Sequence, residues 1–248
     1  MGLAQIASRR GDDAVAESWL ARIEDPRSLT RVQIQRASIL ARQSKMPQAL
    51  DLIRQLPARN PQERRTQLLA EVQLLRDNQA METAYERLKQ ALAQEPADAE
   101  LLYEQAMVAE KMNRLDEMEH LLSTIIASNP THHQALNALG YSLADRGIRL
   151  QEARALIVKA LEQAPEDPFI TDSLGWVEFR LGRHPEALQI LQQAYRARAD
   201  AEIAAHLGEV LWSMGQRDQA LHVWREGLRS APDNTTLRST LQRLRVPL

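Results

Sequence analysis

Prolines and glycines recur along this chain of 248 residues with a period of 34 or 35 residues. Pro61, Pro96, Pro130 and Pro165 follow one another at that interval, and Pro232 lies two periods further on. Seven of the nine glycines occupy two slots of the same frame, the second slot seven residues after the first. The first slot holds Gly140, Gly175 and Gly208, and the second holds Gly11, Gly147, Gly182 and Gly215. A fixed period of this length is the signature of stacked supersecondary units, so the chain is predicted to fold as a stack of repeats.

Each slot fits a unit made of a helix A, a short turn, a helix B and a second turn. A small residue at the first slot lets helix A approach its neighbour closely, and glycine at the second slot ends helix A in a left-handed conformation. Pro47 and Pro185 share a slot at the predicted start of helix B, where a missing amide hydrogen costs nothing. The proline that closes each unit is predicted to stop helix B and to fix the turn. An alanine slot, predicted to pack helix B against helix A, holds Ala16, Ala49, Ala84, Ala187 and Ala220, with Met118 there once and Ala153 displaced by one residue.

Three copies depart from the frame. The copy that begins near Arg65 has no small residue at the first slot, so its helix pair is predicted to splay. The copy that begins at His133 has one extra residue between Gly147 and Ala153. The first copy lacks most of its helix A and the start does not read as a signal peptide, so we expect a fragment of a longer protein.

Composition excludes several classes of function. The 31 basic and 33 acidic residues give a net charge of −2, whereas a general nucleic-acid binder would show a basic excess. The chain has no cysteine, and therefore no disulfide, thiolate metal site or thiol nucleophile. No apolar segment approaches the length of a membrane span, so this fragment is not expected to insert into a membrane.

A search for catalytic chemistry finds no motif that supports it. The six histidines form no H-x-x-x-H pair and are expected to be solvated or to cap helices, which predicts no metal site. Every clustered glycine is explained by helix packing or capping, so no phosphate-binding loop is expected. The carboxylates are expected on polar faces, without a pair in an apolar run that would separate their pKa values. We therefore predict no catalytic residue and no cofactor.

The repeat resembles the tetratricopeptide repeat (TPR), and the resemblance covers essentially the whole chain. It implies an all-α fold, a right-handed α-solenoid of stacked helix-turn-helix units with a concave inner surface. The C-terminal tail has Leu237, Leu241 and Leu244 on one helix face and is predicted to be a capping helix. In one copy the family's marker positions hold Leu207, Gly208, Leu211, Ala220, Trp224, Gly227 and Pro232. The predicted units of this single solenoid are residues 1–29 (partial), 30–64, 65–98, 99–132, 133–167, 168–200 and 201–234, with the capping helix at 235–248.

The resemblance also implies that five slots of each helix A line the concave groove, where a partner protein would bind. For Trp176 and Trp212 two interpretations stay open: burial between neighbouring units, or partly open anchors for a bound chain. Asn137, Asp172 and Glu209 would then hold polar groups of that chain. Trp19 and Trp224 fall in core slots of helix B. The candidate partner-binding residues are Tyr103, Met107, Asn137, Tyr141, Phe169, Asp172, Trp176, Phe179, Arg180, Glu209 and Trp212.

The groove slots also discriminate between classes of partner. They hold no basic clamp, which disfavours the capture of acidic chaperone C-termini. Neutral charge and the marker set disfavour the RNA-reading helical repeats. The expected partner is therefore another protein.

A narrower resemblance covers the second half of the chain. QALNALGYSLADR, DPFITDSLGWVEFRLGRHPEAL and AEIAAHLGEVLWSMGQRDQAL resemble the C-terminal repeats of Gram-negative periplasmic TPR lipoproteins. In Pseudomonas-type bacteria such a lipoprotein is the adaptor of a carboxyl-terminal processing serine protease. The resemblance implies a periplasmic scaffold that holds this protease and presents its substrates, enzymes that cleave cell-wall crosslinks. It also implies attachment to the outer membrane through a lipidated N-terminal cysteine outside this fragment.

Other classes of function stay open. The chain is alternatively a structural assembly subunit of an envelope secretion, pilus or polysaccharide-export machine, or a cytoplasmic protein. Transcriptional or kinase regulation through such repeats would require a fused domain.

Overall fold

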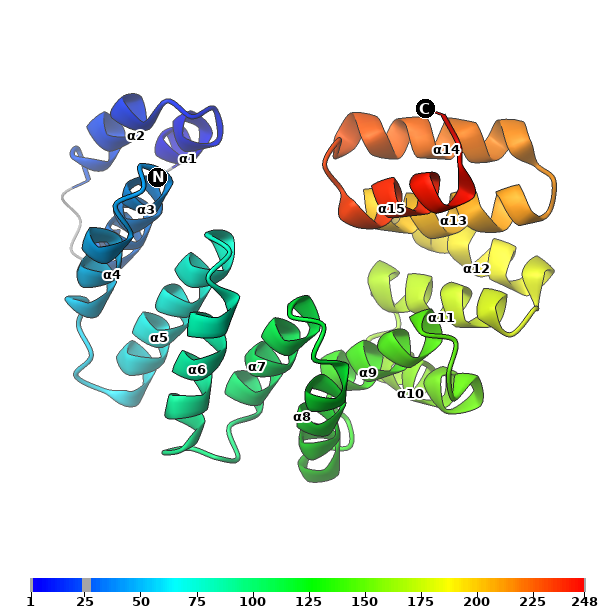
Figure 1. Cartoon of the computed structure of the whole chain (residues 1–248), viewed down its shortest axis with the longest axis horizontal. Helices are drawn as coiled ribbons and strands as arrows, with labels where there is room; N and C mark the ends of the chain where they lie inside the picture. Colours follow the sequence, from blue (N-terminus) through cyan, green and yellow to red (C-terminus); the bar gives the residue numbers. More distant parts are fainter. Residues whose placement is uncertain (1, 24–27, 248) are drawn as a thin grey trace. The chain divides into compact units, whose positions relative to one another are not determined.

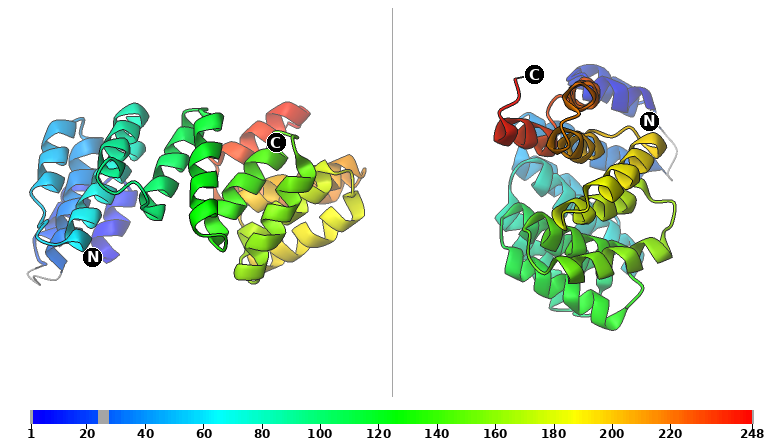
Figure 2. Two further views of the ribbon diagram at one scale, coloured as in Figure 1. Left: turned by 90° about the horizontal axis from the view of Figure 1, so that it is seen from below. Right: turned by 90° about the vertical axis from the view of Figure 1, so that its right-hand side faces the viewer.

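The computed structural model describes residues 2–23 and 28–247, and within them the chain forms fifteen α-helices and no strand. The contacts between residues divide the chain into two compact units, up to Met118 and from Glu119 onward. In each unit, consecutive helices lie side by side as hairpins (Figure 1, Figure 2). The all-α fold of stacked helix pairs is therefore confirmed, whereas one continuous solenoid stays a prediction.

The first unit begins with a truncated pair and continues with full pairs. Its helices are α1 (Gly2–Arg9), α2 (Asp13–Leu20), α3 (Leu29–Arg42), α4 (Met46–Arg54), α5 (Pro61–Asp77), α6 (Met81–Leu92), α7 (Ala99–Lys111) and the start of α8 (Leu115–Ser128). Trp19 is half-buried beside a small core that includes Ala4 and Leu20.

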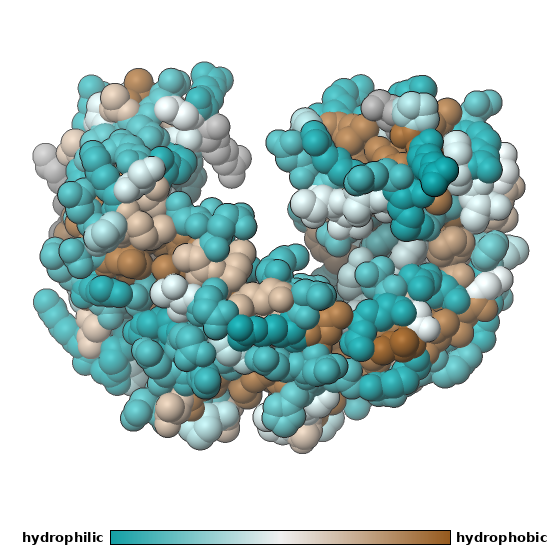
Figure 3. Space-filling view, viewed as in Figure 1, coloured by the Kyte–Doolittle hydropathy of each residue, from teal (hydrophilic) through white to brown (hydrophobic). Residues whose placement is uncertain are grey.

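The second unit contains the copies that follow the frame most closely. Its helices after α8 are α9 (His133–Asp145), α10 (Leu150–Gln163), α11 (Pro168–Arg180), α12 (His184–Ala197), α13 (Ala201–Ser213), α14 (Arg217–Ser230) and the capping helix α15 (Thr235–Leu244). Leu237 and Leu241 of α15 are buried, which confirms the predicted cap. Hydrophilic residues cover most of the visible face of both units (Figure 3).

The second glycine slot ends helix A as the sequence predicts. Gly147 and Gly182 have φ of 69° and 82°, in the left-handed region. Copies without glycine keep the same conformation, because Ser44, Gln79 and Asn113 occupy that slot with φ of 62°, 63° and 58°. The extra residue of the copy from His133 is taken up just before α10, where Arg149 is also left-handed.

The first glycine slot marks the closest approach of helix A to helix B. A Cβ atom on Gly175 would lie 2.6 Å from Leu191 Cγ, and one on Gly208 would lie 2.1 Å from Trp224 Nε1. Trp224 is fully buried and donates from Nε1 to the Ala205 carbonyl oxygen at 3.3 Å. The predicted core role of Trp224 is confirmed.

Two helix starts qualify the role predicted for proline. Pro47 and Pro185 lie in the first turn of α4 and α12, as expected. Pro61, however, does not close the preceding unit; it lies in the first turn of α5, after the N-cap Asn60. The Asn60 side chain accepts a hydrogen bond from the Glu63 amide at 2.8 Å, so α5 begins four residues before the predicted boundary.

The predicted splay of the pair that begins near Arg65 is also found. Val72 fills the first glycine slot and is buried, and α5 packs against α6 less extensively than α11 packs against α12. No helix in the described part of the chain has both the length and the apolar character needed to cross a membrane.

Candidate functional site

Four helices of the second unit enclose a polar pocket of about 360 Å³, which we call the α15 pocket. It is lined by Tyr141, Asp145, Trp176, His206, Thr235, Thr236, Ser239, Thr240 and Arg243. The first four belong to α9, α11 and α13, the A helices of three successive repeats, and the others to the capping helix. Stacking of the repeats thus brings together side chains that are far apart in the sequence.

A buried histidine forms the centre of one wall. His206 is 2% exposed, and its Nδ1 donates to Asp172 Oδ2 at 2.8 Å. Its Nε2 lies 3.3 Å from the Tyr141 hydroxyl, and the Trp176 ring stacks on it with centroids 4.4 Å apart. The prediction that the histidines are solvated or cap helices is wrong for His206, because the stacked repeats supply its partners. It is right for His132, whose Nδ1 accepts a hydrogen bond from the Ala135 amide.

The electrostatics around His206 favour its protonated form. Burial alone would lower the pKa of His206, but attraction to the Asp172 carboxylate and the hydrogen bond to it act in the opposite direction. Glu202 and Asp145 contribute in the same sense as Asp172. The net result is a pKa of His206 above its ordinary value of 6.5.

A bidentate ion pair attaches the capping helix to this wall. Arg243 donates from Nη1 to Glu209 Oε1 at 2.8 Å and from Nη2 to Glu209 Oε2 at 2.6 Å. Glu209 is buried, as is Asp172. The expectation that Asp172 and Glu209 hold a bound chain therefore needs correction, because their carboxylates already pair with His206 and Arg243 within the chain.

Two further buried carboxylates were missed by the expectation that acidic residues lie on polar faces. Glu71 accepts hydrogen bonds from Arg54 and Arg87, which come from the helices before and after it. Glu178 is likewise bound by two arginines, Arg154 and Arg183. The sequence separations differ between the two sites, so no repeat-phased pattern marks them.

The two open interpretations of the groove aromatics separate in the structure. Trp176 is 3% exposed, so it is buried between neighbouring repeats and is not an open anchor. Trp212 is half-buried, and Arg217 lies 3.5 Å from its ring centroid. Phe169 is 37% exposed and has Arg198 at 4.9 Å.

The remaining candidates lie around these residues or outside the pocket. Phe179 is half-buried, 5.4 Å from the Trp176 ring. Arg180 lies over the same ring at 5.6 Å and donates to the Asp145 carbonyl oxygen at 2.7 Å. Tyr103 and Met107 are half-buried on α7 in the first unit, so they do not belong to the α15 pocket.

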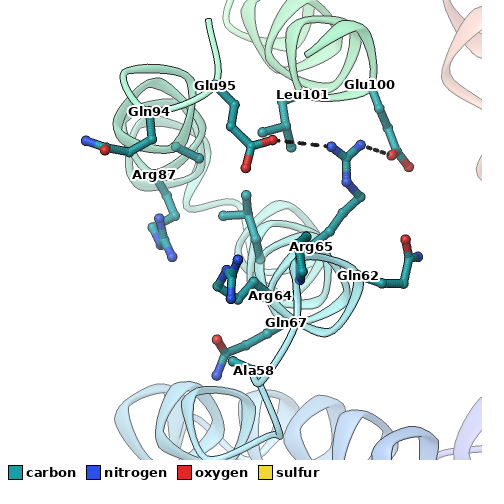
Figure 4. A pocket seen from close by; sticks show the side chains of 13 residues that line it. Ala58, Gln62, Arg64, Arg65, Gln67, Arg87, Gln94, Glu95, Glu100 and Leu101 are labelled. Carbon is teal, nitrogen blue, oxygen red and sulfur yellow. Dashed lines mark hydrogen bonds and ion pairs between the residues drawn. The ribbon is translucent and has the colours of Figure 1, made fainter.

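A larger pocket of about 550 Å³ opens in the first unit, where α5 and α6 splay (Figure 4). Buried Leu68 and Leu101 line it, together with polar side chains that include Gln62 and Gln94. Figure 4 shows Arg65 reaching between Glu95 and Glu100, and Arg65 also pairs with Asp98. These ion pairs join α5 to the turn before α7 and occupy the Arg65 guanidinium.

Neither pocket has the ligands of a metal centre. In the residues that the structure describes, no group of three or more His, Asp or Glu side chains is arranged to hold an ion.

Comparison with known proteins agrees with this geometry. Two tetratricopeptide-repeat family models match the chain, one over residues 178–244 and the other over 103–168 and 149–202. A TPR repeat-containing protein of Pseudomonas aeruginosa is 38% identical over 207 residues, which are 84% of this chain and 35% of the relative. The chain thus spans about a third of the length of that curated relative.

Solved structures show the same fold. A thermophilic TPR protein of Thermus thermophilus has a TM-score of 0.62 and 24% identity, with 72% of this chain and 98% of the other covered. A tetratricopeptide repeat protein of Parabacteroides merdae has a TM-score of 0.67 and 15% identity, with 96% and 94% covered. The repeat frame, the helix pairs and the family models, which together span residues 103–244, lead to one conclusion: the chain belongs to the tetratricopeptide repeat family.

Proposed function

We propose that this chain is part of a periplasmic adaptor that binds a carboxyl-terminal processing serine protease and presents cell-wall hydrolases to it. The family supports the general part of this role, because TPR proteins are generally non-catalytic protein–protein interaction scaffolds. The specific part rests on the resemblance of three segments to the C-terminal repeats of such adaptors.

The observation that carries the proposal is where those three segments lie. They form α9, α11 with the start of α12, and α13 with the start of α14. These helices supply Tyr141, Trp176 and His206 to the α15 pocket. The part of the sequence that resembles the adaptor is therefore the part that builds the polar wall of the candidate site.

The adaptor would act by proximity. A scaffold that holds protease and substrate together replaces a bimolecular encounter by one at a high effective concentration, which can raise the rate by orders of magnitude without new chemistry. As part of the same proposal, the protein is attached to the outer membrane through a lipidated N-terminal cysteine that lies outside these 248 residues.

A cleavage assay tests this role. The purified protease from the same bacterium is mixed with a cell-wall hydrolase substrate at sub-saturating concentration, with and without this chain. We expect faster cleavage with the chain, a rise and then a fall as excess chain separates the two partners, and no cleavage by the chain alone.

A matched control separates scaffolding from simple activation. A short peptide substrate that cannot contact the scaffold should be cleaved at the same rate with and without the chain. Equal rates of hydrolase cleavage in the presence and absence of the chain would rule out the proposed role. Binding without acceleration would instead favour a structural assembly subunit.

A further inference from the structure

The buried polar atoms without a partner gather on one side of the α15 pocket. In the described residues, only Asn137 Oδ1, Asp172 Oδ1 and Trp176 Nε1 are buried with no hydrogen bond. Asn137 lies one helical turn from Tyr141 on α9, and Asp172 lies one turn from Trp176 on α11. Leaving a buried polar group unpaired is unfavourable, so three such atoms on two adjacent helices indicate a place built for a ligand.

An available carboxylate extends this wall. Asp145 lies one further turn along α9, so Asn137, Tyr141 and Asp145 share one helix face. The Asp145 side chain lines the pocket and has no hydrogen bond or ion pair in the described structure. The other charged lining residues, His206 and Arg243, already pair with Asp172 and Glu209.

The available groups are therefore mostly acceptors. Asn137 Oδ1, Asp172 Oδ1 and the Asp145 carboxylate all accept hydrogen bonds, whereas Trp176 Nε1 is the single buried donor without a partner in the described chain. A cation rich in donors complements such a wall, and a guanidinium, with five N–H groups in one plane, fits it better than an ammonium. Arg180 provides a precedent, since its guanidinium donates to the Asp145 carbonyl oxygen and lies over the Trp176 ring.

We propose that the α15 pocket binds an arginine side chain of a partner polypeptide, with the Asp145 carboxylate as its counter-ion. A volume of about 360 Å³ admits one long side chain and part of its backbone. The hydroxyls of Thr236 and Thr240 on α15 face the same space and can accept or donate to that backbone. This inference rests on the proposed function of the chain as a partner-binding scaffold and adds which chemistry one of its sites recognises.

Peptide titration followed by NMR tests the inference. The probe is the pentapeptide Gly-Gly-Arg-Gly-Gly, acetylated and amidated so that its ends are neutral, and its matched controls replace arginine by citrulline or glutamate. We expect saturable binding of the arginine peptide with a shift of the Trp176 indole N–H signal. The citrulline and glutamate peptides should bind at least about five-fold more weakly, because they lack the positive charge.

Variants of the chain assign the effect to this pocket. Asp145→Asn keeps the shape of an exposed side chain that has no internal partner, so it should fold normally and weaken the arginine peptide at least about five-fold. Asp116→Asn, at an exposed position on α8, should leave the affinity unchanged. Equal affinity of wild type and Asp145→Asn, or of the arginine and citrulline peptides, would overturn the inference.

The test is independent of the protease. A chain that binds the arginine peptide through Asp145 but does not accelerate hydrolase cleavage would refute the proposed function alone. A chain that accelerates cleavage equally well as wild type and as Asp145→Asn, with no preference for arginine, would refute the inference alone.

Discussion

His206 on α13 donates a 2.8 Å hydrogen bond from Nδ1 to Asp172 on α11, and both side chains are buried. The two residues are 34 positions apart, one repeat period, so the contact joins neighbouring repeats. It makes the packing of the second unit depend on the protonation of one histidine.

The stability of the second unit should therefore fall as the pH rises above neutrality. The pKa of His206 is raised in the folded chain, so its contribution is fully present below the unfolded value of about 6.5 and is lost as pH rises through the folded pKa. We expect a lower free energy of unfolding at pH 9 than at pH 6, measured by chemical denaturation, and a smaller difference in His206→Gln. An NMR titration that gives His206 a pKa at or below 6.5 would contradict this account.

Removing the carboxylate charge should be costly at the same contact. Asp172→Asn leaves the buried His206 without its counter-ion, and breaking one side of a buried pair costs about 3–5 kcal/mol. The expected measurement is a lower denaturation midpoint at pH 6, with the pKa of His206 falling in the same variant. An unchanged midpoint would show that the pair contributes nothing to the fold.

Trp176 should behave as a core residue and not as a binding anchor. Because its side chain is 3% exposed, Trp176→Ala is expected to lower the free energy of unfolding by about 3–5 kcal/mol. Phe169→Ala, on the same helix but 37% exposed, should cost less than about 1 kcal/mol. Similar losses in the two variants would show that exposure does not separate their roles.

A reciprocal pair of glycine substitutions tests the turn that ends helix A. Gln79 and Gly215 occupy the same slot with φ of 63° and 80°, and a Cβ atom on Gly215 would meet open space. Gln79→Gly should raise the free energy of unfolding by about 1 kcal/mol, and Gly215→Gln should lower it by about the same amount. Changes of the same sign at both positions would refute the left-handed turn as the cause.

The first glycine slot is expected to tolerate no side chain where helix B carries tryptophan. A Cβ atom on Gly208 would lie 2.1 Å from Trp224 Nε1, and Trp224 is fully buried. Gly208→Ala should cost about 2–3 kcal/mol through overpacking of this core. Thermal unfolding of this variant beside Gly182→Ala, whose Cβ would meet no atom within 4 Å, separates overpacking from the strain of a left-handed residue.

Sequence reasoning located the helices because their ends depend on local chemistry. Gly147 and Gly182 end helix A wherever a left-handed residue is needed, and Pro185 starts helix B wherever an amide hydrogen is dispensable, so the repeat period alone fixes these boundaries. Pro61 misled the prediction because proline serves equally well after one helix and at the start of the next.

The polar contacts of the candidate site could not be found in the same way. His206 looked like a solvated residue because its partner is in the preceding repeat, and Glu209 looked free because Arg243 comes from the capping helix. Such pairs depend on how side chains meet when repeats stack, which a slot-by-slot reading of one helix does not contain. The same limit applied to Trp176, where both burial and exposure were compatible with its slot.

Calorimetric titration of the purified carboxyl-terminal processing protease into this chain tests the central claim most directly. The account predicts saturable heat with a fixed stoichiometry, from a scaffold that itself cleaves nothing. Absence of binding at concentrations well above those of both proteins in the cell envelope would contradict it.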